Sequence, residues 1–365
     1  MFHSSTARVH DRRTRTRRLA PAFAFVLAAA AMTGGLQPAR AAEQDSAVPA
    51  GSTVAGLAFP GSGILYKPAA VAESMLDRTT ALGAGWVRFD AAFAEMSPER
   101  GTIKWSGLDR LVQAARDRGL KVLLAIGTTP SWARPAGTDW NHGPVDEAGR
   151  ATFRAFAVEA ATRYRGKVAA YEIWNEPNLG GSWNPQPSPA AYLSLLSTTS
   201  AGIRSADPDA DVISGGTGPS EPGEKALEPL PWYRALYAGG LRSMIDGVAV
   251  HPWPHSDRVD VGEMAQSFEI RKVMDANGDA TKLIWGTETG VPTAGAYSIT
   301  ESAQAAVIPK LYDRWNALPH HGPLFYYTLT DNGGTNREDA FGLLRVNGSE
   351  KPAFGTLKTW ISSNR

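Results

Sequence analysis

Residues 147–178, EAGRATFRAFAVEAATRYRGKVAAYEIWNEPN, decide the fold. The pattern over Glu147–Tyr164 predicts a long helix. The link Arg165-Gly166-Lys167 is short, and the apolar run Val168–Trp174 behind it predicts a strand. A helix that leads through a short link into a strand is half of a parallel βαβ unit, so this segment predicts an α/β protein.

The same alternation recurs along the chain. Apolar runs predict eight strands, at Thr53–Phe59, Trp86–Ala92, Lys121–Thr128, Val168–Trp174, Asp211–Gly215, Ile245–His251, Leu283–Thr287 and Pro323–Thr330. Helical patterns fill the gaps, for example at Ala70–Leu82, Leu108–Arg118, Glu147–Tyr164, Pro189–Ser205, Gly262–Ala276 and Ile299–Leu318, and a helix at Pro352–Ile361 closes the count. Eight units of this length predict a single closed (β/α)8 barrel, the TIM barrel, rather than an open sheet.

The links between these elements are of two kinds. Helix-to-strand links are short, as at Arg118-Gly119-Leu120. Strand-to-helix links are long and rich in Pro, Gly, Trp and Asn, and include residues 134–146, 178–188, 217–228, 252–260 and 331–350. In a (β/α)8 barrel all the long links would lie at the C-terminal ends of the strands, where active sites are found.

The N-terminus has the features of a secretory signal peptide. An arginine-rich segment precedes the apolar run Leu19–Met32, and Ala39-Arg40-Ala41 offers a cleavage site. A single membrane anchor is the alternative, but the apolar run is shorter than the roughly 20 residues that span a bilayer. We therefore expect a signal peptide at 1–41, a linker at 42–52, a catalytic barrel at 53–365 and a secreted, monomeric product; Arg17-Arg18 would suit twin-arginine export.

Charge and composition exclude several classes of function. The whole chain has a formal net charge of +1 and no cysteine. The leader carries seven arginines and one aspartate, a net +6, which leaves about −5 for the mature protein. An acidic protein is a poor partner for nucleic acid, and the missing cysteines exclude disulfides and thiolate chemistry.

Two glutamates stand at predicted strand ends. Glu176 follows the fourth strand, and Pro177 directly after it ends the strand. Glu288 lies in IWGTETG, residues 284–290, at the end of the seventh strand. The spacing between them fits three barrel units, so the two carboxylates would face each other across one mouth. Cleavage of a glycosidic bond needs such a pair, one as acid and the other as nucleophile or base.

Several motifs resemble clan A glycoside hydrolases, which are retaining (β/α)8 enzymes. WNEPN at 174–178 resembles their acid/base motif. Further segments, at Trp86–Asp90, Pro98–Asp109, Thr129–Ala133 and Asp246–Trp253, are similar to family 39 and its bacterial exopolysaccharide endoglycosidase relatives, and next to family 5 cellulase-like enzymes. The resemblance extends from about Val54 to Thr356.

The resemblance implies a role for each site residue. Glu176 would be the acid/base and Glu288 the nucleophile. Asn175 would bind the substrate 2-hydroxyl, Arg88 and His251 would hold the nucleophile or the sugar, and Trp132 and Trp253 would be stacking platforms. By position alone, Asp90 and Tyr327 are further candidates for sugar contact.

Each of these residues also has a purely structural interpretation. Glu176 and Glu288 could be loop carboxylates, and Asn175 could simply cap a turn. A buried Arg88 must be paired, and strand alternation places Glu172 on the same side as Glu176, so either Glu172 or Glu288 could be its partner. His251 and His255 have zinc-like spacing, but the prolines at 252 and 254 forbid a helix there, so we expect no metal site.

The sequence therefore predicts a secreted retaining glycoside hydrolase that cleaves a β-linked polysaccharide or oligosaccharide without a cofactor. A transglycosylase with the same residues and a non-catalytic carbohydrate-binding barrel remain as alternatives. Retention of both glutamates favours an enzyme, because binding alone needs neither.

Overall fold

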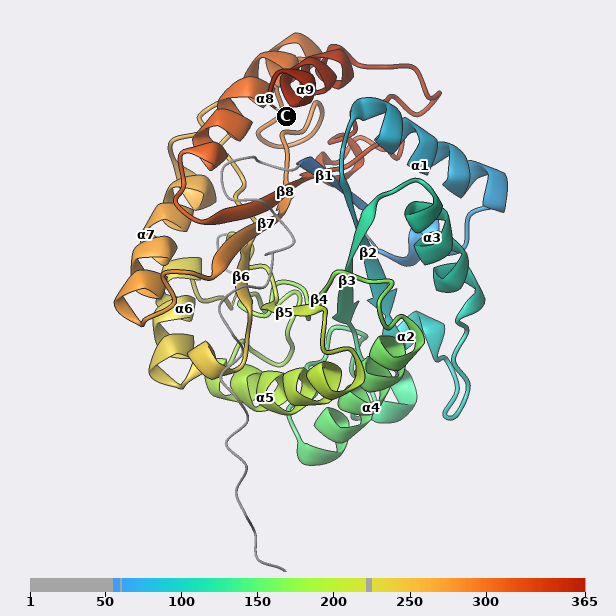
Figure 1. The fold of residues 1–365 in the computed structure, drawn as a ribbon, viewed down its shortest axis with the longest axis vertical. Helices are drawn as coiled ribbons and strands as arrows, with labels where there is room; N and C mark the ends of the chain where they lie inside the picture. Colours follow the sequence, from blue (N-terminus) through green and yellow to red (C-terminus); the bar gives the residue numbers. More distant parts are fainter. Residues whose placement is uncertain (1–54, 60, 221–224, 365) are drawn as a thin grey trace, which may run out of the picture. The chain divides into compact units, whose positions relative to one another are not determined.

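The computed structural model describes residues 55–59, 61–220 and 225–364 (Figure 1). Eight parallel strands form a closed barrel in sequence order, so the predicted TIM barrel is confirmed. The strands are β1 (Ala55–Phe59), β2 (Trp86–Ala92), β3 (Lys121–Gly127), β4 (Ala170–Ile173), β5 (Asp211–Ser214), β6 (Gly247–Val250), β7 (Leu283–Thr289) and β8 (His321–Tyr327). The expected signal peptide at 1–41 and linker at 42–52 lie outside the described residues.

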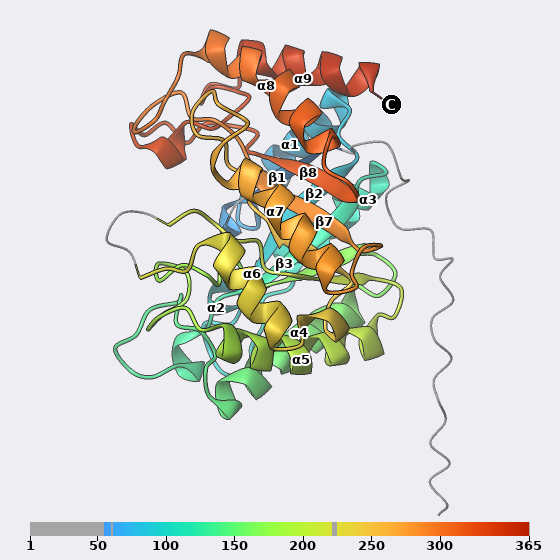
Figure 2. The same cartoon turned by 90° about the vertical axis from the view of Figure 1, so that its left-hand side faces the viewer.

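The helices surround the barrel (Figure 1). They are α1 (Ala69–Leu82), α2 (Phe93–Met96), α3 (Ser106–Asp117), α4 (Glu147–Arg163), α5 (Pro189–Ala206), α6 (Pro229–Ala238), α7 (Gly262–Ala276), α8 (Glu301–Asn316) and α9 (Pro352–Ser363), with short 3-10 turns η1 (Ser62–Ile64), η2 (Ser131–Ala133), η3 (Leu241–Ser243) and η4 (Arg337–Asp339). In both views α4 and α5 lie together on one side of the barrel, and α8 and α9 lie together on the other (Figures 1 and 2). No helix in the described part of the chain is long and apolar enough to cross a membrane.

The alternation of side chains along each strand divides the core into two layers. On β2, Val87 and Phe89 are fully buried between the sheet and the helices. Trp86 points into the barrel, where it packs with inward residues of the other strands, such as Trp285 and Phe325. Because successive side chains of a strand point to opposite faces, Arg88 follows Trp86 on the inner face, one layer closer to the mouth.

The strand pairing is irregular where β7 meets β8. The register shifts between Ile284 and Gly286, and again between Gly286 and Thr289. Trp285 and Thr287 both point into the barrel, so a regular strand would turn the next residue, Glu288, outward. The irregular pairing instead lets Glu288 reach the mouth, which simple alternation does not predict.

Candidate active site

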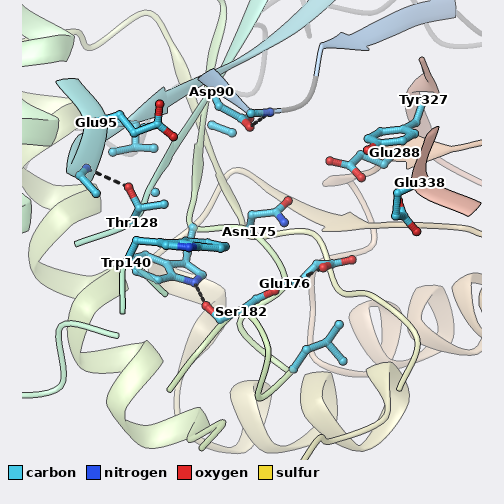
Figure 3. A pocket seen from close by; sticks show the side chains of 18 of the residues that line it. Asp90, Glu95, Thr128, Trp140, Asn175, Glu176, Ser182, Glu288, Tyr327 and Glu338 are labelled. Carbon is cyan, nitrogen blue, oxygen red and sulfur yellow. Dashed lines mark hydrogen bonds between the residues drawn. The ribbon is translucent and has the colours of Figure 1, made fainter. Parts of the chain in front are cut away.

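A cavity of about 580 Å³ opens at the C-terminal ends of the strands (Figure 3). Its lining comes from strand ends and from the loops that follow them, and includes Asp90, Asn175, Glu176, Glu288 and Tyr327. The volume is typical of cavities that bind small organic molecules. With Trp253, which also lines it, six of the nine predicted site residues therefore line one cavity.

Arg88 connects the buried polar groups beneath this cavity. Its side chain is 1% exposed. Nε donates to Glu172 Oε2 at 2.6 Å, and Nη1 donates to Glu288 Oε1 at 2.6 Å. Nη2 donates to the Asn175 amide oxygen at 2.8 Å. Burial alone would lower the pKa of Arg88, but Glu172 and Glu288 raise it, so the guanidinium keeps its charge.

Glu172 is the fully buried partner that holds Arg88 from β4. Its Oε1 accepts from the Gly216 backbone N–H at 2.8 Å and from Thr287 Oγ1 at 3.0 Å. The carboxylate thus has three donors, which satisfies a charge that no water reaches. Both pairings that strand alternation allowed for Arg88 are present, one on each side of the guanidinium.

Glu176 reaches the cavity through an irregular backbone rather than through a regular strand. Its φ is +48°, and its N–H donates to Gly216 O at 2.9 Å. Its Oε1 lies 3.1 Å from His251 Nδ1, and Ser182 Oγ is 3.4 Å from its Oε2. His251, which follows β6, and Ser182, in the loop after β4, thus each hold one oxygen of this carboxyl.

His251 lies at the end of β6 and faces both glutamates. Nδ1 is 3.1 Å from Glu176 Oε1 and 3.8 Å from Glu288 Oε2. Those two oxygens can thus be no more than about 7 Å apart, the sum of the two distances. The ring is fully buried.

The two glutamates differ in proton affinity. Burial raises the pKa of Glu288 to about 7, although His251 and Arg88 act in the opposite direction. Burial also acts to raise the pKa of Glu176, but the hydrogen bond and charge of His251 outweigh it and hold that pKa below its ordinary value. Burial acts to lower the pKa of His251, but the two glutamates raise it. Of the two carboxyls, Glu288 therefore has the higher proton affinity in the free site.

The remaining predicted residues fall into two groups. Asp90 lines the cavity, its Oδ2 accepts from Gly61 N at 2.7 Å, and burial raises its pKa. Trp253 and Tyr327 form one aromatic wall, with ring centroids 5.6 Å apart. Since Trp253 is only 7% exposed, most of its surface packs against protein.

Trp132 does not line the cavity, although it was expected to be a stacking platform. Its Nε1 donates to Ser97 O at 2.8 Å. One ring contact is an edge packing against Phe93, and the Arg100 guanidinium lies 4.8 Å from the ring centroid. The indole N–H and the ring are thus engaged in packing the loop after β3.

Other cavity residues were not predicted. Glu95 on α2, Ser182 in the loop after β4, and Glu338 on η4 all line it. Ser182 and Glu338 lie on long strand-to-helix links, which were their only signal, and Glu95 lies just after β2. Among the described residues, no group of three or more His, Asp or Glu side chains is arranged to hold a metal ion.

Comparisons with known proteins place the chain in a family. A family model described as Cellulase (glycosyl hydrolase family 5) matches residues 45–259. A search among curated proteins finds no match.

Solved structures share the fold. A family 39 glycoside hydrolase from the gut symbiont Bacteroides cellulosilyticus WH2 is 22% identical with a TM-score of 0.69; the alignment covers 85% of this chain and 64% of that one. A GH5_18 structure from Streptomyces cattleya in complex with GlcNAc is 18% identical (TM-score 0.68, 86% and 80% covered). The exo-beta-1,4-mannosidase Op5Man5 from Opitutaceae bacterium strain TAV5 is 17% identical (TM-score 0.61, 86% and 60% covered).

The resemblance to clan A is thus confirmed, with family 5, the second of the two families expected, as the match. The family model spans more than half of the chain. The protein therefore belongs to glycoside hydrolase family 5 of clan A, and it is a glycoside hydrolase.

Proposed function

We propose that this glycoside hydrolase cleaves a β-linked polysaccharide or oligosaccharide with retention of configuration, with Glu176 as acid/base and Glu288 as nucleophile. One observation carries the proposal. Carboxyls from the ends of β4 and β7 face the same nitrogen of His251, with facing oxygens no more than about 7 Å apart. Retaining enzymes separate their carboxyls by about 5–5.5 Å, whereas inverting enzymes need roughly 6.5–9.5 Å to admit a water. The upper limit of about 7 Å admits the retaining separation and leaves room for only the shortest inverting ones.

The first step forms a glycosyl-enzyme. A Glu288 oxygen attacks the anomeric carbon, and the bond from that carbon to the leaving oxygen breaks. Glu176 gives its proton to the leaving oxygen, so the departing chain ends in a hydroxyl. Arg88 holds Glu288 in place and Asn175 lies beside the reacting centre, where the amide N–H2 can donate to a sugar hydroxyl while its oxygen accepts from Arg88.

The second step regenerates the enzyme. Glu176, now a carboxylate, takes a proton from water, and the oxygen of that water attacks the anomeric carbon. The bond to Glu288 breaks, and the sugar leaves with the configuration it had in the substrate.

The first step requires a protonated Glu176 and a charged Glu288 when substrate is bound, the reverse of the order of proton affinity in the free site. Substrate binding favours that reversal. The leaving oxygen accepts a hydrogen bond only from a protonated Glu176, and positive charge that develops at the anomeric carbon favours a charged Glu288. His251 Nδ1 lies 3.1 Å from Glu176 Oε1 and 3.8 Å from Glu288 Oε2, so a charged imidazole favours the carboxylate form of both residues.

We also propose that the enzyme acts outside the cell after removal of residues 1–41. The proposal rests on the arginine-rich segment, the apolar run and the Ala39-Arg40-Ala41 site. The N-terminal sequence of protein recovered from culture medium should start at Ala42. Full-length protein that stays with the cells would contradict export by cleavage.

The decisive experiment is reducing-end release by the mature protein on β-glucans, xylans, mannans, galactans and bacterial exopolysaccharides. Glu176→Gln and Glu288→Gln serve as controls, because each keeps the side-chain shape and removes the acid or the nucleophile. We expect wild type alone to release ends, and NMR of the first product to show the anomer of the substrate. Initial release of the opposite anomer would contradict retention, and full activity of either variant would contradict its assigned role.

A further inference from the structure

Trp140 is a large apolar side chain that is exposed to solvent. It lies in the loop between β3 and α4, is 56% exposed, and lines the cavity. Figure 3 shows it with Glu95 and Thr128 at one end of the cavity, with Glu288 and Glu338 at the other end and Asn175 between them. An indole that remains this exposed at the wall of a binding cavity gains little from packing, so a ligand that covers it would bury apolar surface.

The loop that carries Trp140 is tied down on both sides. Its backbone oxygen accepts from Thr129 N at 2.9 Å. Asn141 Nδ2 donates to Gly181 O at 2.6 Å, and Asn184 N donates to Asn141 O at 3.0 Å. These bonds join the loops after β3 and β4 into one ledge, residues 140–143 and 181–184. Trp140 is therefore positioned by backbone contacts that leave its ring uncovered.

The inside of this ledge shows that exposure of Trp140 is not caused by poor packing. Trp183, also in the ledge, is fully buried. Gly143 lies so close to it that a Cβ at this position would be 2.4 Å from the Trp183 ring. The two loops thus pack as tightly as a glycine allows, and one indole is buried while the other faces the cavity.

The ledge also connects the Trp140 end of the cavity to the proposed acid/base. Ser182 belongs to the ledge, and its Oγ lies 3.4 Å from Glu176 Oε2. Its backbone oxygen accepts from Trp174 Nε1 at 2.8 Å. A ring bound against Trp140 would thus be held in a fixed relation to the carboxyl that protonates the leaving oxygen.

We propose that Trp140 is the platform of an outer sugar subsite, on which a pyranose ring outside the scissile pair stacks, with the Glu95 carboxylate accepting hydrogen bonds from its hydroxyls. The inference rests on the proposed function, which it deepens. The apolar C–H face of a sugar ring suits an indole, and a carboxylate is a strong acceptor for hydroxyl groups. The occupant is then an oligosaccharide segment of at least three units, and a disaccharide bound across the scissile bond would leave this subsite empty.

The test measures binding in a Glu176→Gln background, so that nothing is cleaved. The probes are cellohexaose, xylohexaose, mannohexaose and laminarihexaose, each with its disaccharide. The readouts are the indole N–H signal of Trp140 in ¹⁵N-tryptophan-labelled protein and the Kd by calorimetry. We expect at least one hexasaccharide to shift the Trp140 signal. Trp140→Ala should lower the affinity for that hexasaccharide by about 10-fold and leave the affinity for the disaccharide unchanged.

Matched variants exclude a general effect of losing an aromatic ring. Tyr297 is 57% exposed on the loop after β7 but does not line the cavity, so Tyr297→Ala should bind as the background does. Trp140→Phe should keep most of the affinity for the hexasaccharide. Glu95→Gln should lower the affinity for the hexasaccharide and leave that for the disaccharide unchanged.

Several outcomes would overturn the subsite. The first is a Trp140 indole signal that no hexasaccharide shifts. The second is a loss of hexasaccharide affinity in Tyr297→Ala equal to that in Trp140→Ala. The third is a Trp140→Ala variant that loses as much affinity for the disaccharide as for the hexasaccharide. Hydrolysis by the otherwise unchanged enzyme separates the two proposals. If wild type cleaves a polymer and Trp140→Ala cleaves it with the same KM, the subsite is wrong and the proposed function stands.

Discussion

The Arg88–Glu172 pair allows a quantitative test of the buried core of the site. Its N–O distance is 2.6 Å, and the side chains are 1% and 0% exposed. The chain offers a matched pair at the surface, Arg118–Asp77, with a distance of 2.7 Å and side chains that are 21% and 66% exposed. Because the distances are nearly equal, burial is the main difference between the pairs.

Glu172→Gln preserves the shape of the buried side chain and removes its charge. The three donors around Glu172 are Arg88 Nε, Gly216 N and Thr287 Oγ1. Glutamine has one oxygen and one N–H2 group, so in either orientation a donor meets a donor; the Thr287 hydroxyl can turn to accept, but the other two groups cannot. An unsatisfied buried donor costs about 1–3 kcal/mol, and breaking a buried ion pair costs about 3–5 kcal/mol.

We therefore expect Glu172→Gln to lower the free energy of unfolding by about 3 kcal/mol. Asp77→Asn at the surface should lower it by less than about 1 kcal/mol. Urea unfolding of the mature protein measures both, provided that the slope of the free energy against urea is the same in each variant. If the two substitutions lowered the free energy of unfolding by amounts within about 1 kcal/mol of each other, the reasoning would be refuted. Burial would then not make the Arg88–Glu172 pair more costly to break than the surface pair.

Three further predictions follow from the site. Because burial raises the pKa of Glu288 to about 7 and the pair needs one proton, kcat/KM should fall above about pH 7, and a profile that stays level to about pH 9 would contradict this assignment. Glu288→Ala should abolish hydrolysis, and azide should restore turnover with a glycosyl azide as product; unimpaired hydrolysis would move the nucleophile elsewhere. Gly216→Ala would place a Cβ 2.4 Å from His251 Nε2 and should lower stability by about 1–3 kcal/mol in thermal unfolding, whereas Gly355→Ala in α9, where a Cβ meets nothing within 4 Å, should raise it slightly.

Most of the fold could be predicted because it follows from periodic patterns. All eight strands lie where the apolar runs placed them, and β8 differs most, at His321–Tyr327 instead of Pro323–Thr330. Helices with clear start signals were also located well: α4 begins after Asp146, whose side chain accepts from Gly149 N. The single turn of α2, Phe93–Met96, was not expected, because four residues carry no helical period.

The site was predictable in position but not in orientation. Strand ends identified Asn175, Glu176 and Glu288 as neighbours of one mouth, and all three line the cavity. Trp132 follows a strand in the same way but is engaged with Ser97 and Phe93. An aromatic side chain on a loop can face the protein or the cavity. Its direction depends on how neighbouring loops pack together, and no local sequence pattern predicts that packing.

The residues whose side-chain direction the strand pattern does not predict lie where the backbone departs from regular geometry. Thr128, Trp174 and Glu176 all have positive φ, which costs a residue other than glycine about 1–3 kcal/mol. Hydrogen bonds to neighbouring segments offset this cost: Trp174 N donates to Ile126 O of β3 at 2.8 Å, and Glu176 N donates to Gly216 O, just after β5, at 2.9 Å.

Such irregularity has a consequence for the chemistry. In a regular β4, alternation would place residue 174 on the same face as Glu172, yet the Trp174 ring packs outward against Trp183. The turn at Trp174 frees the inner face for Asn175 and Glu176, which both line the cavity. On β7 the shifted register does the same for Glu288. Both carboxylates thus reach the mouth because their strands stop being regular one or two residues before them, while the regular parts of the same strands hold Glu172 and Thr287 in the buried network below.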